Sequence, residues 1–312
     1  MSRTVVAALA LAALLAPGCA AKNDATACRT GSDCASGACD IAGRCVPVVT
    51  PDTGAEVGDT GAEADVSPDT FVAETDASPG CTITADGTIA ADKVPAAAGF
   101  KATFRVAQSV AVNTAGTDAG GGLRKWDLST KLAGDKDILV ETLAPSGAWW
   151  AGSFTGATYA TPLSITADTL GIFQVTAAAI TLRGAVSPTG GTLRTELTYA
   201  TPPRMLAFPL KLGATWTDTS NVTGLTSGVT SYYTEKYDAK VDQRGELSTP
   251  FGSFPVLRVK MVLTRTLGTM PTVIRTYAFV SPCFGTIAQI VSQTNELSEE
   301  FTTASEVKRL AP

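Results

Sequence analysis

Apolar and polar side chains alternate along most of residues 81–312, and this alternation constrains the fold more than any other feature of the sequence. In the segment PVLRVKMVLTRT, every second residue from Leu257 to Leu263 is apolar, whereas Arg258 and Lys260 fall on the opposite side. Strands with one apolar and one solvent-exposed face are typical of antiparallel sheets. About ten such segments, separated by glycine and proline turns, predict an all-β domain, either an antiparallel sandwich or a strongly curved half-barrel.

The last segment of this domain, NELSEEFTTASEVKRL, is compatible with two kinds of element. Leu297, Phe301 and Ala304 would share one face of a helix. Phe301, Thr303 and Val307 would equally share one face of a strand. The pattern leaves both open.

The chain begins with the pattern of an export signal. Arg3 precedes an unbroken run of 12 apolar residues from Val5 to Ala16, and small residues follow the run. A helix needs about 20 apolar residues to span a bilayer, so the run is too short for a transmembrane helix. We therefore expect residues 1–18 to be a cleaved signal peptide.

The residues LAPGC that end at Cys19 resemble the lipobox of bacterial lipoproteins. The resemblance implies that Cys19 is acylated, and that residues 19–27 form the lipidated N-terminus of the mature chain. Two or more acyl chains make a stable membrane anchor, so the membrane is an expected partner. In such lipoproteins, Ala20 in place of aspartate after the acylated cysteine is the pattern for the outer membrane, at its periplasmic or its cell-surface face.

Four further cysteines form a cluster in residues 28–45, namely Cys28, Cys34, Cys39 and Cys45. Their spacing contains no C-x-x-C pair and the chain has no histidine, which favours a disulfide knot over a zinc site or a redox dithiol. Three pairings of these cysteines remain open. The segment also resembles small cysteine-rich stretches near the N-terminus of secreted bacterial surface proteins. The remaining pair, Cys81 and Cys283, is expected to form a disulfide in the same oxidising compartment.

Residues 46–80 change composition abruptly, with eight acidic residues and no lysine or arginine. Low hydrophobicity combined with charge of one sign predicts a disordered linker. This linker accounts for the net charge of −5, because residues 81–312 carry 20 basic and 18 acidic residues. The basic residues there form no cluster, so we expect no nucleic-acid partner.

Residues 205–312 contain a characteristic set of turn residues and aromatic residues. It consists of Pro209, Gly213, Trp216, Thr249, Pro250, Gly252, Phe254, Tyr277 and Gly285. The pattern is similar to that of uncharacterised envelope lipoproteins, some of them with the open half-barrel of carriers in the LolA and LolB style. This resemblance implies a β-domain and brings no catalytic residues.

The absence of histidine excludes Ser-His-Asp and Cys-His catalysis and histidine-ligated metals. We expect no cofactor, no metal and no enzymatic activity. Trp149 and Trp150 would face opposite sides of one strand, with one in the core and the other available to a ligand or partner. Glu235 is two residues from both Tyr233 and Tyr237, so its side chain should point to the same side of the strand as theirs. We place Glu235 on an edge strand rather than in a catalytic carboxylate pair.

Together these features predict a lipid-anchored envelope or cell-surface lipoprotein. Its noncatalytic β-domain would serve structural or adhesive recognition of a protein or a glycan. One alternative is a carrier or sensor that holds an apolar ligand inside a half-barrel. The other is an envelope hydrolase that uses carboxylates.

Overall fold

The computed structural model describes residues 87–165 and 168–312. Regular structure in these residues is almost entirely β-strand, with two short 3-10 helices, η2 (Ala91–Lys93) and η3 (Ala151–Ser153). The strands are β1 (Lys101–Ala111), β2 (Thr117–Gly120), β3 (Leu123–Asp127), β4 (Lys136–Glu141), β5 (Tyr159–Pro162), β6 (Leu170–Val175), β7 (Ala179–Val186), β8 (Glu196–Tyr199), β9 (Arg204–Ala207), β10 (Thr215–Thr226), β11 (Val229–Ser248), β12 (Ser253–Leu267), β13 (Met270–Ser281), β14 (Gly285–Ser292) and β15 (Thr303–Leu310).

The N-terminal segments of the sequence analysis all lie outside the described residues. They are the signal peptide (1–18), the lipidated N-terminus (19–27), the cysteine knot (28–45) and the acidic linker (46–80), and Cys81 lies outside as well. Among the residues that the structure describes, no helix is both long enough and apolar enough to cross a membrane.

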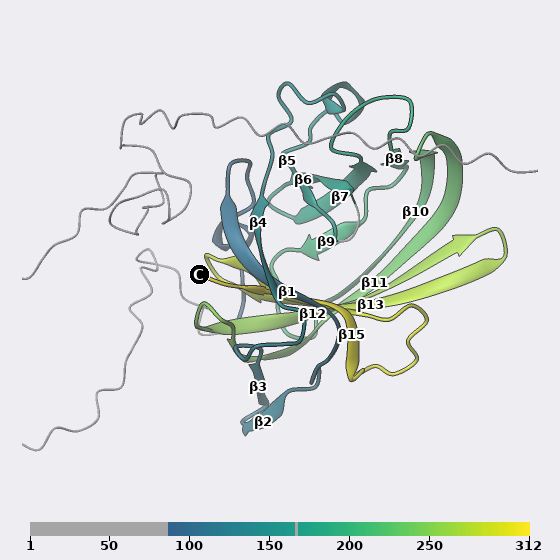
Figure 1. The fold of residues 1–312 in the computed structure, drawn as a ribbon. Coiled ribbons are helices and arrows are strands. Elements are labelled where there is room, and N and C mark those ends of the chain that lie inside the picture. The colour runs from purple at the N-terminus through teal and green to yellow at the C-terminus, as the bar shows by residue number, and fades with distance from the viewer. Residues whose placement is uncertain (1–86, 166–167) are drawn as a thin grey trace, which may run out of the picture. The chain divides into compact units, whose positions relative to one another are not determined.

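Twelve strands form one antiparallel sheet in the order β4-β1-β15-β14-β13-β12-β11-β10-β8-β7-β6-β5. The two ends of this sheet approach each other where Leu143, just after β4, and Ala160 of β5 exchange backbone hydrogen bonds of 2.7 and 2.9 Å. The all-β expectation is therefore confirmed, and the sheet is a nearly closed barrel rather than a sandwich or a half-barrel (Figure 1). Register shifts typical of β-bulges occur in β11 at Val241/Gln243, in β13 at Phe279/Val280 and in β14 at Val291/Ser292, and such bulges increase the local twist that helps the sheet to curl.

The larger hydrophobic cluster lies in the barrel interior, where side chains from strands as far apart as β6 and β13 belong to one group. The alternation of β12 places Leu257, Val259 and Met261 in this cluster, as predicted. Trp216 of β10 and Tyr237 of β11 belong to it too. The inward face of the barrel is therefore built as a packed core over much of its extent.

A second cluster covers the opposite face of β12, β13, β14 and β15, with Tyr277 and Phe279 among its members. Trp126 of β3 and Phe301, which precedes β15, lie over this face, and the Trp126 and Phe279 rings meet edge to face at 5.1 Å. Arg258 lies on the same face and is only 1% exposed. The expectation that Arg258 faces solvent is wrong, because alternation assigns a residue to a face but does not reveal that another segment covers it.

The structure decides the open alternative for the C-terminal segment and corrects the strand that was expected at Trp149 and Trp150. Residues 303–310 form β15, which pairs with both β1 and β14, so the strand alternative is correct. GAWWAGSF is a turn followed by η3 rather than a strand. Trp150 and Phe154 pack from this turn into a third hydrophobic cluster against β6 and β7.

Strand β3 is attached to the barrel through a close backbone approach at Gly245. It pairs in parallel with the C-terminal part of β11, in the register Gly245↔Arg124 to Ser248↔Asp127, and β2 pairs with its other edge. A Cβ atom at Gly245 would overlap the backbone carbonyl of Arg124. Glycine at this position is thus required for β3 to reach β11.

We predict that Gly245→Ala loosens β2 and β3 from the barrel, because the added methyl group displaces the Arg124 backbone. The expected cost is about 1–3 kcal/mol in the free energy of unfolding. Urea unfolding measures this loss, and hydrogen exchange should quicken in residues 117–127. Gly252→Ala is the matched control, since the nearest atom to its Cβ would be 3.9 Å away in the Phe254 ring. Equal stability of the two variants would contradict the prediction.

Candidate functional site

The candidate site is a groove of about 400 Å³ where β3 lies against β11 and β12. Its apolar lining includes Leu123, Phe254, Val256 and Leu257. Its charged lining consists of Arg124, Lys125, Arg244 and Glu246. Gly87, the first residue that the structure describes, also lines the groove.

The groove carries an excess of positive charge, with three cationic side chains against one carboxylate. Lys125 pairs with Glu246 at 3.9 Å, and both side chains are more than half exposed. Within residues 87–165 and 168–312, Arg124 and Arg244 take part in no ion pair. The Arg244 Nε is buried and lacks a hydrogen-bond partner, which is a costly state for a charged donor. This groove is therefore suited to an anionic group attached to an apolar one.

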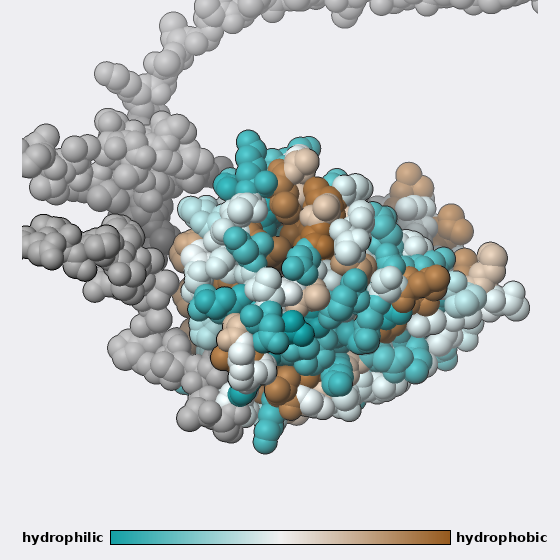
Figure 2. Space-filling view, turned by 90° about the horizontal axis from the view of Figure 1, so that it is seen from below, coloured by the Kyte–Doolittle hydropathy of each residue, from teal (hydrophilic) through white to brown (hydrophobic). Residues whose placement is uncertain are grey.

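A second, more polar cavity of about 400 Å³ adjoins the groove and shares Lys125 and Glu246 with it. Asn113, Thr117 and Ser248 also line this cavity. Figure 2 views the molecule from below Figure 1, the side on which β2 and β3 lie, and shows hydrophilic side chains over most of that face with apolar ones gathered in smaller areas.

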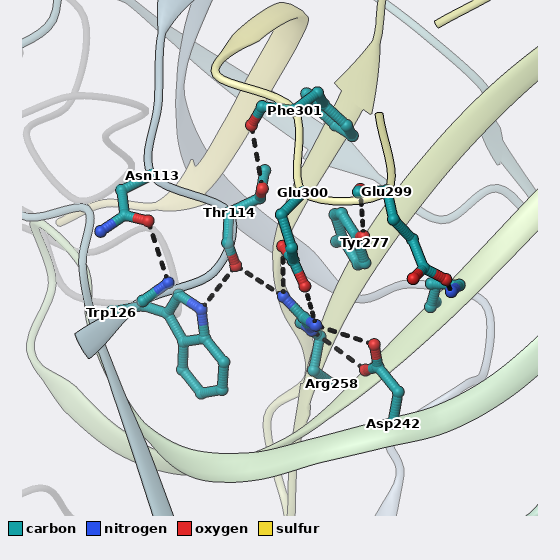
Figure 3. A network of polar contacts seen from close by, with 11 residues as sticks. Asn113, Thr114, Trp126, Asp242, Arg258, Tyr277, Glu299, Glu300 and Phe301 are labelled. Carbon is teal, nitrogen blue, oxygen red and sulfur yellow. Dashed lines mark hydrogen bonds and ion pairs between the residues drawn. The ribbon is translucent and has the colours of Figure 1, made fainter. Parts of the chain in front are cut away.

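A buried ion-pair network centred on Arg258 holds the segments next to the groove (Figure 3). Arg258 Nη2 lies 2.7 Å from Asp242 Oδ2 and 2.6 Å from Glu300 Oε1, and Nη1 donates to the Thr114 carbonyl at 2.5 Å. The guanidinium lies 4.3 Å from the Tyr277 ring centroid, within cation–π range. This single side chain therefore joins β11, β12 and β13 to two covering segments.

The electrostatics of the network favour its charged form. Burial by itself lowers the pKa of Arg258, but hydrogen bonds and charges from Asp242 and Glu300 outweigh burial and raise it. Burial likewise raises the pKa of Glu300, and the hydrogen bond and charge of Arg258 reverse that effect, so the pKa is lowered overall. The ion pairs are thus stable at neutral pH.

The network also fixes the position of β3. Thr114 accepts from Arg258 and from the Trp126 indole Nε1 at 2.9 Å through the same carbonyl oxygen, and its hydroxyl donates to the Phe301 carbonyl at 2.9 Å. Arg309 adds a second buried anchor, since its Nε donates to the Leu128 carbonyl at 2.8 Å and its Nη2 pairs with Asp135 at 2.7 Å. Two arginines therefore hold β3, one wall of the groove, against the barrel.

Glu235 lies elsewhere, on the interior side of β11, and is 0% exposed. Strand β11 runs between β10 and β12, so the expectation of an edge position is wrong. Its Oε2 accepts from the Tyr199 and Tyr237 hydroxyls at 2.8 and 2.5 Å, and Arg265 Nε donates to Oε1 at 2.7 Å. Both carboxylate oxygens are occupied by these partners, which suits a structural role better than that of a nucleophile or a base.

The two tryptophans occupy different environments. Trp150 is 2% exposed and packs in the third cluster, whereas Trp149 is partly buried and donates its Nε1 to the Ser187 carbonyl at 3.1 Å. The Arg194 guanidinium lies 5.9 Å from the Trp149 ring. Neither tryptophan lines the groove, so a ligand role for Trp149 stays a prediction.

Of the seven cysteines, Cys283 alone lies in the described residues, and its backbone N–H donates to the Lys93 carbonyl at 2.6 Å. Acylation of Cys19, the knot at Cys28, Cys34, Cys39 and Cys45, and the Cys81–Cys283 bridge stay predictions. In the part of the chain that the structure describes, no group of three or more histidine, cysteine, aspartate or glutamate residues could hold a metal ion.

The described residues define an all-β protein with a nearly closed antiparallel barrel of 12 strands and a basic, partly apolar groove beside it. Comparison with known protein families, curated proteins and solved structures finds no match.

Sequence reasoning did not identify the residues that build this site. Arg124 and Arg244 carry no motif, and they meet only because β3 pairs with β11. The buried position of Arg258 had one signal, the pair Glu299 and Glu300 directly before an apolar residue near the C-terminus. A buried cation needs a carboxylate partner, and Glu300 supplies one to Arg258.

We predict that Arg258→Met strongly destabilises the barrel, because it leaves Asp242 and Glu300 without their cation. The expected loss is about 3–5 kcal/mol in the free energy of unfolding, measured by urea denaturation. Arg105→Met is the control. Arg105 pairs with Asp137 at 2.7 Å, but this ion pair lies at the surface, so its loss should lower the free energy of unfolding far less. A similar effect of the two substitutions would refute the role assigned to Arg258.

Proposed function

We propose that this protein is a lipid-anchored envelope or cell-surface lipoprotein whose barrel is a noncatalytic recognition domain. In this proposal Cys19 carries the lipid anchor, and the groove beside β3 binds an acidic, partly apolar segment of a partner protein. The observation that carries it is the groove itself, in which Arg124, Lys125 and Arg244 surround an apolar lining.

Two features of the barrel favour this function over the alternatives. The interior cluster is packed with buried side chains, whereas a carrier needs space for its ligand there. Glu235, the best hydrolase candidate, has both oxygens engaged by Tyr199, Tyr237 and Arg265. A peptide segment also fits the groove better than a glycan, because Leu123, Phe254 and Val256 offer apolar contacts beside the cations.

The anchor is tested on the native protein. We expect mass spectrometry of the purified chain to show a mature N-terminus at Cys19 that carries acyl groups, because LAPGC ends there. The variant Cys19→Ser should lose the acyl mass and leave the membrane fraction. An intact N-terminus with an unmodified Cys19 would overturn the anchor.

The groove is tested with a fluorescent synthetic peptide rich in glutamate and phenylalanine, added to the full chain. We expect Arg124→Glu with Lys125→Glu to weaken binding at least about tenfold, since opposite charges guide and hold the probe. Binding to the unaltered chain should also weaken as salt is raised.

The matched control for this experiment is Lys101→Glu with Lys136→Glu, which changes the net charge equally on β1 and β4. This control should bind the peptide like the unaltered chain. Equal loss in both double variants would mean a general charge effect and would refute the groove. An acidic polysaccharide that binds more tightly than the peptide would replace the proposed partner class.

A further inference from the structure

We infer that residues 71–86 of the same chain bind the groove beside β3 and compete there with the external partner. This inference rests on the proposed function, because it assigns to the recognition groove an internal ligand that regulates it. Three observations on the groove and the sequence support it, together with one predicted disulfide.

The chain enters the described structure at the groove. Gly87 lines the groove, and a Cβ on Gly87 would lie 3.5 Å from Arg244 Nη1. Asp86 precedes Gly87 directly in the sequence, and consecutive Cα atoms are about 3.8 Å apart. The segment that precedes Gly87 is therefore attached to a residue that lines the groove, and a short path would bring it into the groove.

The charges of segment and groove are complementary. Residues 71–86 contain Glu74, Asp76 and Asp86 and no lysine or arginine. The groove presents three cations and one carboxylate, and the buried Arg244 Nε has no acceptor. A carboxylate or a backbone carbonyl of the segment is the kind of group that this nitrogen needs.

The segment also carries apolar residues that match the groove lining. Phe71, Val72 and Ile83 are spaced along it, and the lining includes Phe254 and Val256. Burial of these side chains would add to the electrostatic attraction.

The predicted Cys81–Cys283 disulfide would hold the segment next to the groove at a second point. Phe284, the neighbour of Cys283, meets the Phe254 ring edge to face at 4.8 Å, and Phe254 lines the groove. Residues 82–86 would then be confined between this point and Gly87. A ligand confined in this way acts at a high effective concentration, so weak contacts suffice to occupy the groove.

Hydrogen exchange on the full chain tests the inference without any external probe. We expect amides in residues 71–86 to exchange at least about tenfold faster in Arg124→Glu with Lys125→Glu than in the control Lys101→Glu with Lys136→Glu. Both double variants should retain the circular dichroism of the unaltered chain, which separates release of the segment from unfolding. The same exchange rate of residues 71–86 in both variants would overturn the inference.

A second arm measures competition with the glutamate-rich probe peptide. Neutralising the segment by Glu74→Gln, Asp76→Asn and Asp86→Asn should strengthen probe binding at least about fivefold. As a control, neutralising Asp52, Glu56 and Asp59, which lie upstream of the segment, should leave the affinity for the probe peptide unchanged.

The two arms distinguish the two proposals. If the probe binds the groove and exchange in residues 71–86 does not respond, the internal ligand is wrong and the recognition function stands. If hydrogen exchange in residues 71–86 becomes faster in Arg124→Glu with Lys125→Glu but the probe peptide binds neither neutralised variant, the segment occupies the groove. The proposal that the groove binds an external partner is then wrong.

Discussion

The ion pairs of Arg258 are the interaction on which the outer layer of this barrel depends. Moving a guanidinium out of water is expensive, and the cost is offset only when charges and hydrogen-bond acceptors surround it. Here Asp242, Glu300 and the Thr114 carbonyl supply them, from segments far apart in the sequence. The network is complete only when all these segments are in place, so it couples the covering segments to the barrel wall.

The Arg258 network also determines the shape of the groove, because it holds the strand that forms one wall. Its wall β3 contacts the barrel through the backbone approach at Gly245 and through Trp126, whose indole shares the Thr114 carbonyl with Arg258. Arg309 holds the chain that follows β3 in the same way. Two of the cations that line the groove, Arg124 and Lys125, lie on this strand, which is itself held by buried charge. Buried ion pairs thus position the cationic groove at the surface.

Alternation in the sequence was enough to predict strands and most inward-facing residues, because the period of two is a local property. Closure of the barrel was not predictable, since it depends on Leu143 meeting Ala160 across the whole sheet. Glu235 was misplaced for the same reason: strand order decides whether a strand is at an edge, and order is not local. Arg258 was assigned to the correct face, but the segments that cover this face come from elsewhere in the chain. The groove residues were missed because β3 and β11 meet only in the folded chain.

The distribution of charge sets a requirement on any partner of the groove. Under the inference above, residues 71–86 with Glu74, Asp76 and Asp86 would compete with an external partner for the groove. A tethered competitor can act at an effective concentration in the millimolar range. A free partner at lower concentration must then bind correspondingly more tightly, through more carboxylates or better apolar contacts. Salt weakens both interactions, so it changes the competition less than it changes either affinity. Salt does not screen contacts with the apolar lining at Phe254 and Val256, so a partner gains an advantage there only by burying more apolar area than Phe71, Val72 and Ile83 would.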